Sequence, residues 1–93
     1  MILSYKGKFI EAVAAGKCPK GFPADLLSSA NRRLQAVANA VRLEDLRSPP
    51  GNRLERLHGD RDGQHSIRIN DQWRICFRWS DAGAEDVEIV DYH

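Results

Sequence analysis

The sequence predicts an α+β domain in which an N-terminal helical hairpin packs on a small, mainly antiparallel sheet. Apolar residues recur at helical spacing in the first half of the chain and alternate with polar residues in the second half. The chain has 93 residues, the length of one small domain, so we expect residues 1–93 to fold as a single unit.

Two helical patterns occupy the first half, and a segment with two prolines and a glycine (residues 17–23) separates them. The first pattern ends before Gly16 and consists of Phe9, Ile10, Val13 and Ala14. The second starts after Pro23, spans roughly five turns, and consists of Leu26, Leu27, Ala30, Leu34, Val37, Ala38 and Val41. We expect the segment SPPGN (residues 48–52) to end helical structure.

The second half reads as strands. Residues 53–63 begin as an alternating strand with Leu54 and Leu57 as anchors and then run into a loop. After a turn predicted at residues 80–86, Val87 and Ile89 mark a last strand. The apolar start, residues 1–5, is a possible edge strand.

Residues 64–79 predict a hairpin whose two faces differ in chemistry, because successive side chains of a strand point to opposite sides. Asn70 and Asp71 suit its tight turn. One face is apolar and is formed by Ile67, Ile69, Trp73, Ile75, Phe77 and Trp79. The other carries Arg68, Arg74, Cys76 and Arg78, and we expect it to stay open toward an anionic partner.

Charge is unevenly distributed although the net charge is only +1. Residues 53–78 contain six arginines and no lysine, whereas residues 81–93 contain five acids and no basic residue other than histidine. Arginine favours bidentate recognition of phosphate. The alternative is that these arginines pair with Glu55, Asp60, Asp62 and the acidic last strand, as surface ion pairs commonly do.

Several classes of function lack support in the sequence. There is no apolar run of about 20 residues and no secretory signal pattern at the start, so we expect a cytoplasmic protein without membrane contact. Cys18 and Cys76 are expected to be free thiols, and Cys76 to be a packing residue. The histidines and cysteines lack metal-ligand spacing, and no nucleophile elbow or glycine-rich phosphate loop occurs, so we expect no metal or cofactor.

The remaining combination suits cleavage of RNA without metal. RNA carries its own nucleophile, the 2′-hydroxyl, so a protein needs only a base, an acid and charge stabilisation. The chain ends in Asp91, Tyr92 and His93, and histidine titrates near pH ~6.5. The alternative is that these three residues are a frayed tail and the arginines only keep the sheet soluble.

Two stretches, LRSPPGNRLERLHGDRDGQHSIRINDQWRICFRW (residues 46–79) and DVEIVDYH (residues 86–93), resemble HigB toxins of type II toxin–antitoxin modules. These toxins are the plasmid-maintenance killer branch of the RelE superfamily. The resemblance spans the whole chain and implies a RelE-like fold. It also implies an endonuclease that cuts messenger RNA in the A site of the 70S ribosome by metal-independent 2′-hydroxyl attack. The implied inhibitor is a HigA-type antitoxin with a helix-turn-helix domain.

The resemblance also implies roles for individual residues. Arg74, in QWRI, matches the arginine expected to hold the phosphate, and the terminal DYH (Asp91, Tyr92 and His93) matches the catalytic end. The residues expected to bind RNA are His58, Arg61, Arg68 and Arg78.

One departure from the family concerns the segment before the loop at Gly59. Some relatives have a functional histidine where this chain has Glu55, and a lysine where it has His58. Whether His58 supplies charge, transfers a proton or only caps a strand stays open.

Two other functions remain as alternatives. One is a non-catalytic module that binds RNA or the ribosome through the same arginines. The other is a superfamily toxin that poisons a protein target such as DNA gyrase.

Overall fold

A four-stranded antiparallel sheet forms the centre of the structure, a computed structural model that describes residues 1–91. Tyr92 and His93 lie outside the described residues. The strands lie side by side in chain order, as β1 (Glu55–Arg56), β2 (His65–Arg68), β3 (Trp73–Ser80) and β4 (Gly83–Asp91). The predicted α+β class is confirmed.

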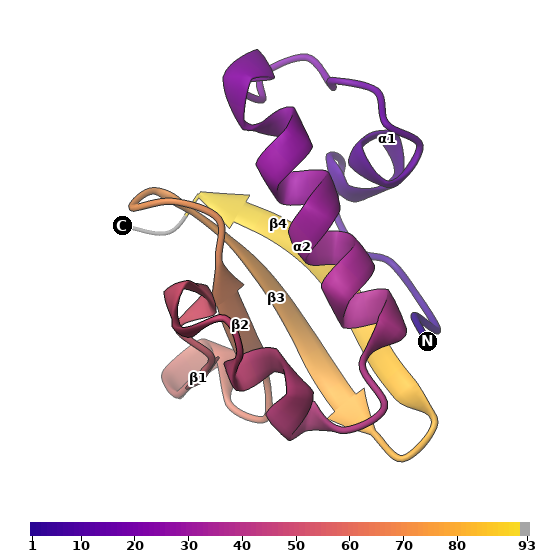
Figure 1. The fold of residues 1–93 in the computed structure, drawn as a ribbon, viewed down its shortest axis with the longest axis vertical. Helices are drawn as coiled ribbons and strands as arrows, with labels where there is room; N and C mark the ends of the chain where they lie inside the picture. Colours follow the sequence, from indigo (N-terminus) through magenta and orange to yellow (C-terminus); the bar gives the residue numbers. More distant parts are fainter. Residues whose placement is uncertain (92–93) are drawn as a thin grey trace.

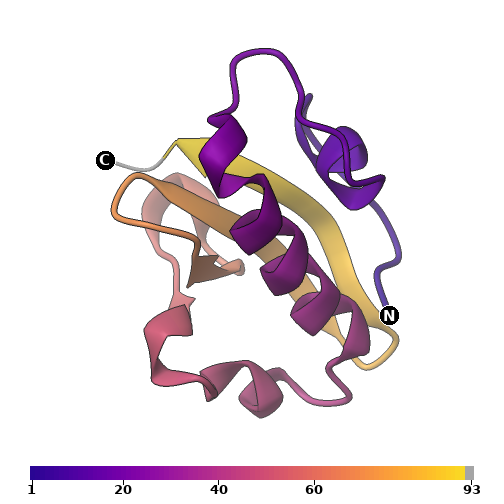
Figure 2. The same cartoon turned by 45° about the horizontal axis from the view of Figure 1, so that its top comes forward.

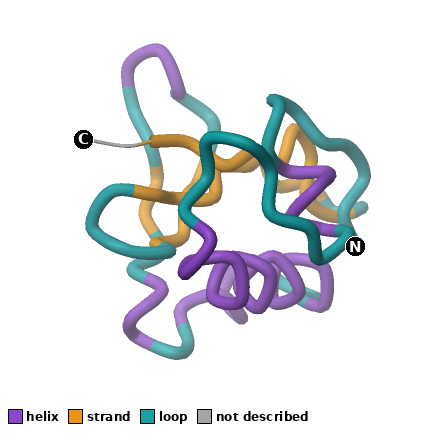
Figure 3. The backbone as a smooth tube through the Cα atoms, turned by 90° about the horizontal axis from the view of Figure 1, so that it is seen from above, coloured by secondary structure: helices purple, strands orange, loops and turns teal. Residues whose placement is uncertain are grey.

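Two helices cover one face of this sheet. They are α1 (Ile10–Ala14) and α2 (Leu27–Asn39), and a 3-10 turn, η1 (Ala24–Leu26), leads into α2. In Figures 1 and 2, α2 crosses the sheet over β3 and β4, and Figure 3 shows this long helix beneath the strands. The apolar stripe of α2 is buried at Ala30, Leu34 and Val37. It packs in one cluster with the apolar side chains of the strands, which include Ile67, Ile75, Phe77, Val87 and Ile89.

The helical layer is smaller than the sequence predicts. α1 has only five residues, so the hairpin has one very short arm that packs against α2. α2 ends at Asn39, and Val41, predicted to belong to its apolar stripe, is 85% exposed. The prediction that Val41 belongs to the apolar stripe is wrong. The Asp45 carboxylate accepts the backbone N–H groups of Val41 and Arg42 and turns the chain away from the helix axis.

The segment between α2 and β2 winds along the β2 edge of the sheet in short turns. These are η2 (Leu43–Arg47), η3 (Pro50–Asn52) and η4 (Gly59–Arg61), with the two-residue β1 between η3 and η4. The expectation that SPPGN ends helical structure is therefore wrong at η3, since proline at the first position suits a short helical turn. Leu57 is buried as predicted, although the strand that precedes it is shorter than expected.

The connection between β3 and β4 is also tighter than predicted. β3 ends at Ser80 and β4 begins at Gly83, so the turn consists of residues 81–82 rather than 80–86. β4 then pairs on its outer side with the start of the chain through parallel bridges from Ile2 to Ala84 and from Tyr5 to Val87. The predicted edge strand is thus present as two isolated bridges.

The predicted hairpin between β2 and β3 is confirmed. Ser66 lies opposite Cys76, and Arg68 lies opposite Arg74. The Asn70 side chain accepts the backbone N–H groups of Gln72 and Trp73 at 2.9 and 2.7 Å, which closes the loop.

Within residues 1–91, none of the helices is long and apolar enough to cross a membrane.

Candidate active site

The sheet face turned away from the helices carries the predicted arginines, and we refer to it as the arginine face. Its members on β2 and β3 are Ser66, Arg68, Arg74, Cys76 and Arg78. The neighbouring side chains Ile67, Trp73, Ile75 and Phe77 are buried in the apolar cluster, as the alternation predicts. Glu88 of β4 lies opposite Cys76 and therefore joins the same face.

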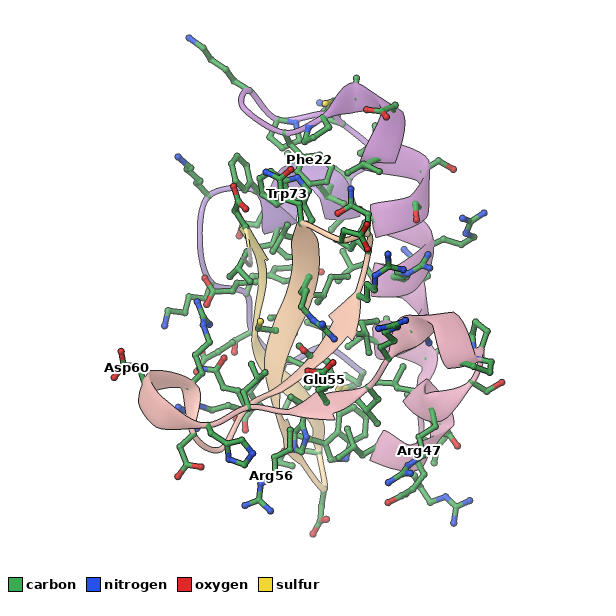
Figure 4. All side chains as sticks on the ribbon, turned by 90° about the vertical axis from the view of Figure 1, so that its left-hand side faces the viewer. Phe22, Arg47, Glu55, Arg56, Asp60 and Trp73 are labelled. Carbon is green, nitrogen blue, oxygen red and sulfur yellow. The ribbon has the colours of Figure 1, made fainter. Side chains whose placement is uncertain are left out.

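Arg74 is enclosed on this face by three acceptors. Its Nε donates to Ser66 Oγ at 2.9 Å, and its Nη2 donates to the backbone oxygen of Arg53 at 2.8 Å. Nη2 also lies 3.4 Å from Glu55 Oε1, and only 11% of the Arg74 side chain is exposed. The expectation that Arg74 points into open solvent is wrong, because the chain around β1 folds over this part of the face. Figure 4 shows Glu55 of β1 directed toward the sheet and Arg56 directed away from it.

Local structure before β1 sets the position of the Arg53 carbonyl. Arg53 adopts a left-handed backbone conformation (φ 46°), which is uncommon for a residue with a side chain. Asn52 before it is buried, and its amide donates to the backbone oxygens of Leu46 and Ser48 at 3.2 and 3.3 Å. These contacts hold the turn that presents the Arg53 oxygen to Arg74.

A second part of the arginine face is closed by η4. Arg61 donates to Glu88 Oε1 at 2.9 Å and to Gln64 Oε1 at 3.1 Å. Beside this pair, Ser66 and Cys76 are fully buried. Burial raises the pKa of the Cys76 thiol from 9.0 to about 11. The prediction that Cys76 is a packing residue is confirmed. Arg61 forms an ion pair with Glu88, an acid of the last strand.

Arg68 and Arg78 form the more exposed ends of the face. Arg68 forms an ion pair with Asp71 of the hairpin loop, whose side chain is 99% exposed. Arg78 Nε lies 3.8 Å from Asp86 Oδ2, and 46% of its side chain is exposed. The ion-pair alternative holds for Arg74, which pairs with Glu55, and for Arg61 and Arg78, which pair with acids of the last strand. Arg68 pairs instead with Asp71, an acid that the alternative did not include, and the exposed pairs of Arg68 and Arg78 are of the kind that contributes little.

His58 and Asp91 flank this face at different places. His58 is exposed at the N-cap position of η4, where its side chain makes no capping hydrogen bond. Asp91 ends β4 opposite Trp73, and Gln72 Nε2 donates to its Oδ2 at 3.0 Å. Val90, not Asp91, lies opposite Arg74, so the alternation directs Asp91 to the other side of the sheet end. Tyr92 and His93, also predicted to be catalytic, fall outside the described residues.

The structure adds neighbours of Arg74 that sequence reasoning did not assign. Ser66 was identifiable, since it alternates with Arg68 on the same strand face. Glu55 was expected as a possible ion-pair partner of the arginines without being assigned to Arg74, and the Arg53 contact uses a backbone oxygen, which no side-chain pattern reveals. His65 is half-buried, and its pKa is lowered by burial and by the nearby charge of Arg56.

Two other features of residues 1–91 bear on ligand binding, namely metal-binding side chains and a surface hollow. Among residues 1–91, no group of three or more His, Cys, Asp or Glu side chains is placed to hold a metal ion. A hollow of about 340 Å³ lies near the turn between β3 and β4, at the opposite end of β3 from Trp73 and Asp91. It is lined by Val41, Arg42, Leu43, Glu44, Trp79 and Asp81.

This geometry suits charge stabilisation at a phosphate. A guanidinium held by fixed acceptors needs no reorganisation when negative charge develops beside it. The neighbouring Arg68 and the exposed Arg78 add positive charge along the same face.

Comparison with known proteins gives two kinds of match. Residues 4–93 match the protein family described as RelE-like toxin of type II toxin–antitoxin system HigB. Toxin HigB-1 of Vibrio cholerae serotype O1 is 38% identical over 85 residues, which cover 90% of each chain. Endoribonuclease HigB of Proteus vulgaris is 33% identical over 93 residues, which cover 100% of both chains.

Proposed function

This chain belongs to the RelE-like HigB toxins of type II toxin–antitoxin systems, and we propose that it is an endoribonuclease that cuts messenger RNA on the ribosome. The observation that carries the proposal is the enclosure of Arg74 by Ser66 Oγ and the Arg53 carbonyl, which positions a guanidinium for a phosphate. A relative that is 33% identical over the full length of both chains bears the name endoribonuclease.

The reaction we propose is an in-line transesterification. The 2′-oxygen of the nucleotide before the cut forms a bond to phosphorus as the bond from phosphorus to the 5′-oxygen breaks. The proton of the 2′-hydroxyl passes to a base of the protein, and an acid donates a proton to the departing 5′-oxygen. Arg74 neutralises the charge that builds on the non-bridging oxygens. The products are a cyclic 2′,3′-phosphate and a free 5′-hydroxyl.

The end of the chain supplies the proton transfers in this proposal. His93 is the imidazole that exchanges protons near neutral pH. Asp91 extends from the last strand on the side away from Arg74, so we assign it the role of orienting that imidazole rather than touching the phosphate. Tyr92, with a reference pKa near ~10, orients the nucleotide by stacking or by a hydroxyl hydrogen bond.

The ribosome belongs to the proposal because the described surface offers little to order a free RNA strand. Much of the arginine face is closed by β1 and η4, which leaves Arg68, Arg78 and His58 as its exposed contacts. A messenger strand already held in the A site of the 70S ribosome would need few contacts beyond these and the one from Arg74 to the phosphate. The activity would therefore take place in the cytoplasm.

A protein antitoxin follows from the type II family, and we propose a HigA-type antitoxin with a helix-turn-helix domain. Sequencing the open reading frame next to the toxin gene tests for this partner. A small helix-turn-helix protein that copurifies with the chain and abolishes its toxicity is the expected result.

The test of the proposed function compares two substrates for the purified toxin. We expect fast cleavage of messenger RNA on translating ribosomes and far slower cleavage of the same RNA alone, measured by mapping 5′ ends. Equal rates on both substrates would contradict ribosome dependence. Growth arrest with intact messenger RNA would instead favour a binding module or a protein target such as DNA gyrase.

A further inference from the structure

Three arginines gather where α2 meets the end of β2, beside the site at Arg74. Arg33 Nε donates to the backbone oxygen of Arg68 at 2.5 Å, and Arg33 Nη1 donates to Ser29 Oγ at 2.9 Å. Arg32 is exposed and precedes Arg33 on the helix. We call Arg32, Arg33 and Arg68 the α2 arginine cluster.

Positive charge in this cluster is poorly matched. Both acceptors of Arg33 are neutral, and neither Arg32 nor Arg33 forms an ion pair with any residue in the range 1–91. The one acid paired with the cluster is Asp71, whose side chain is 99% exposed and contributes little. Burial lowers the pKa of Arg33, and the like charges of Arg32 and Arg68 lower it further.

The cluster is also next to the candidate active site. Arg68 lies directly opposite Arg74 on the neighbouring strand, which places their Cα atoms roughly 5 Å apart. The loop that follows Arg68 is connected to the end of β4 by the hydrogen bond from Gln72 to Asp91. α2 packs on the other face of the sheet, but Arg33 reaches the backbone of Arg68 at the end of β2, so the cluster lies at the rim of the sheet next to Arg74.

We propose that the α2 arginine cluster binds a phosphodiester of RNA at a nucleotide away from the one that is cut. The inference rests on the proposed function, which assigns the scissile phosphate to Arg74. Arg33 is suited to the task because its backbone and Ser29 contacts fix the guanidinium before any ligand arrives. An anion there offsets the mutual repulsion of the three arginines. The phosphate belongs either to the messenger strand or to ribosomal RNA.

The experiment measures binding, not cleavage, with 2′-O-methyl RNA, which lacks the nucleophilic hydroxyl. Affinity is measured by fluorescence anisotropy at several salt concentrations. The slope of log K against log salt concentration is negative. For Arg33→Gln we expect its magnitude to decrease by about 0.7 and binding to weaken about fivefold at 0.1 M salt, because one phosphate contact is lost. Arg33→Lys keeps the charge and should retain most of the slope.

The matched control is Arg47→Gln, which removes the same charge from η2. Arg47 is exposed, and Figure 4 shows it at the opposite end of the molecule from Trp73. This variant should leave the slope unchanged. Because Arg33 has structural contacts, Arg32→Gln provides a second test at an exposed position, with the same expected fall in slope.

A parallel measurement identifies the source of the phosphate. If the Arg33→Gln and Arg32→Gln variants bind the oligonucleotide normally but sediment less with ribosomes than the Arg47→Gln control does, the phosphate belongs to ribosomal RNA. Wild-type behaviour of both variants in both assays would overturn the inference. If the wild-type toxin binds RNA through these arginines but cleaves no messenger RNA on ribosomes, the proposed endonuclease activity is refuted. The inference that the α2 arginine cluster binds a phosphate would still stand.

Discussion

The Arg74 side chain receives its contacts from two separate parts of the chain. Ser66 is its neighbour across the hairpin, whereas Arg53 and Glu55 come from the segment before β2. Because only 11% of the side chain is exposed, its removal leaves Ser66 Oγ and the Arg53 oxygen without their donor. Arg74 thus serves the fold as well as the proposed reaction.

Arg74→Ala should lower both activity and stability. We expect cleavage on ribosomes to fall about 100-fold or more, the usual effect of losing a contact to transition-state charge. The free energy of unfolding should fall by about 1–3 kcal/mol, since the buried Ser66 hydroxyl loses a charged donor. Cleavage assays and urea unfolding measure the two effects.

The control for this substitution is Arg78→Ala on the same face. Arg78 is 46% exposed and has a long ion pair, so its loss should change the free energy of unfolding by no more than about 0.5 kcal/mol. Unchanged cleavage by a folded Arg74→Ala protein would show that the phosphate is held elsewhere.

Cys76 should be inert and should make stability depend on pH. Burial raises the pKa of its thiol from 9.0 to about 11 in the folded chain, so the unfolded chain loses this proton first. Stability from this group is fully present below pH 9 and is lost between about pH 9 and 11. At pH 8, a thiol reagent should modify exposed Cys18 in the native protein and both cysteines after denaturation. Native modification of both would contradict the burial of Cys76. The Cys76→Ala variant is the control. The pH dependence that remains in its free energy of unfolding comes from other titrating groups.

At the scale of elements, the start of the chain depends on a glycine in β4. Gly83 has a φ of +139°, and a Cβ there would lie 2.3 Å from the backbone oxygen of Met1. That oxygen accepts the backbone N–H of Ala84, one of the bonds that hold the first residues along β4.

Gly83→Ala should therefore detach the first residues and lower the free energy of unfolding by about 1–3 kcal/mol. Gly51→Ala is the matched control, since a Cβ at Gly51 meets nothing within 4 Å. Its effect should stay within about 0.5 kcal/mol. Faster amide exchange of Ala84 and Leu3 in the Gly83 variant is the second readout. Equal stability of the two variants would contradict the account of the β4 edge.

Elements with a long regular pattern were predictable from the sequence, and short ones were not. The alternation in β2 and β3 identified the arginine face, because each side chain's direction follows from its neighbours. β1 has only two residues and carries no period, so the sequence indicated that Glu55 could pair with an arginine but not that β1 would lie over Arg74. The break in register between Cys76 and Arg78 likewise depends on the left-handed backbone of Asp86, which alternation cannot reveal.

At the scale of the whole molecule, the candidate site gathers at one end of the sheet. The β2–β3 loop, Arg68 and the end of β4 meet there, and Figure 1 shows the tip of β4 beside that loop. The N-terminus and the turn between β3 and β4 lie at the other end. The resemblance to the family is confirmed, and the alternation placed Arg74 on the face away from the core, but how Arg74 is enclosed depends on contacts from distant segments.

We propose that this chain cuts messenger RNA on the ribosome with the help of its last residues. The most direct measurement is 5′-end mapping of messenger RNA in translating ribosomes with the full chain and with a chain that lacks Tyr92 and His93. No residue of the described core is removed, so the truncated protein should fold and still bind ribosomes. We predict cuts with the full chain and none with the truncated chain. Full cleavage by a folded truncated protein would contradict the account and make His58 the histidine to examine.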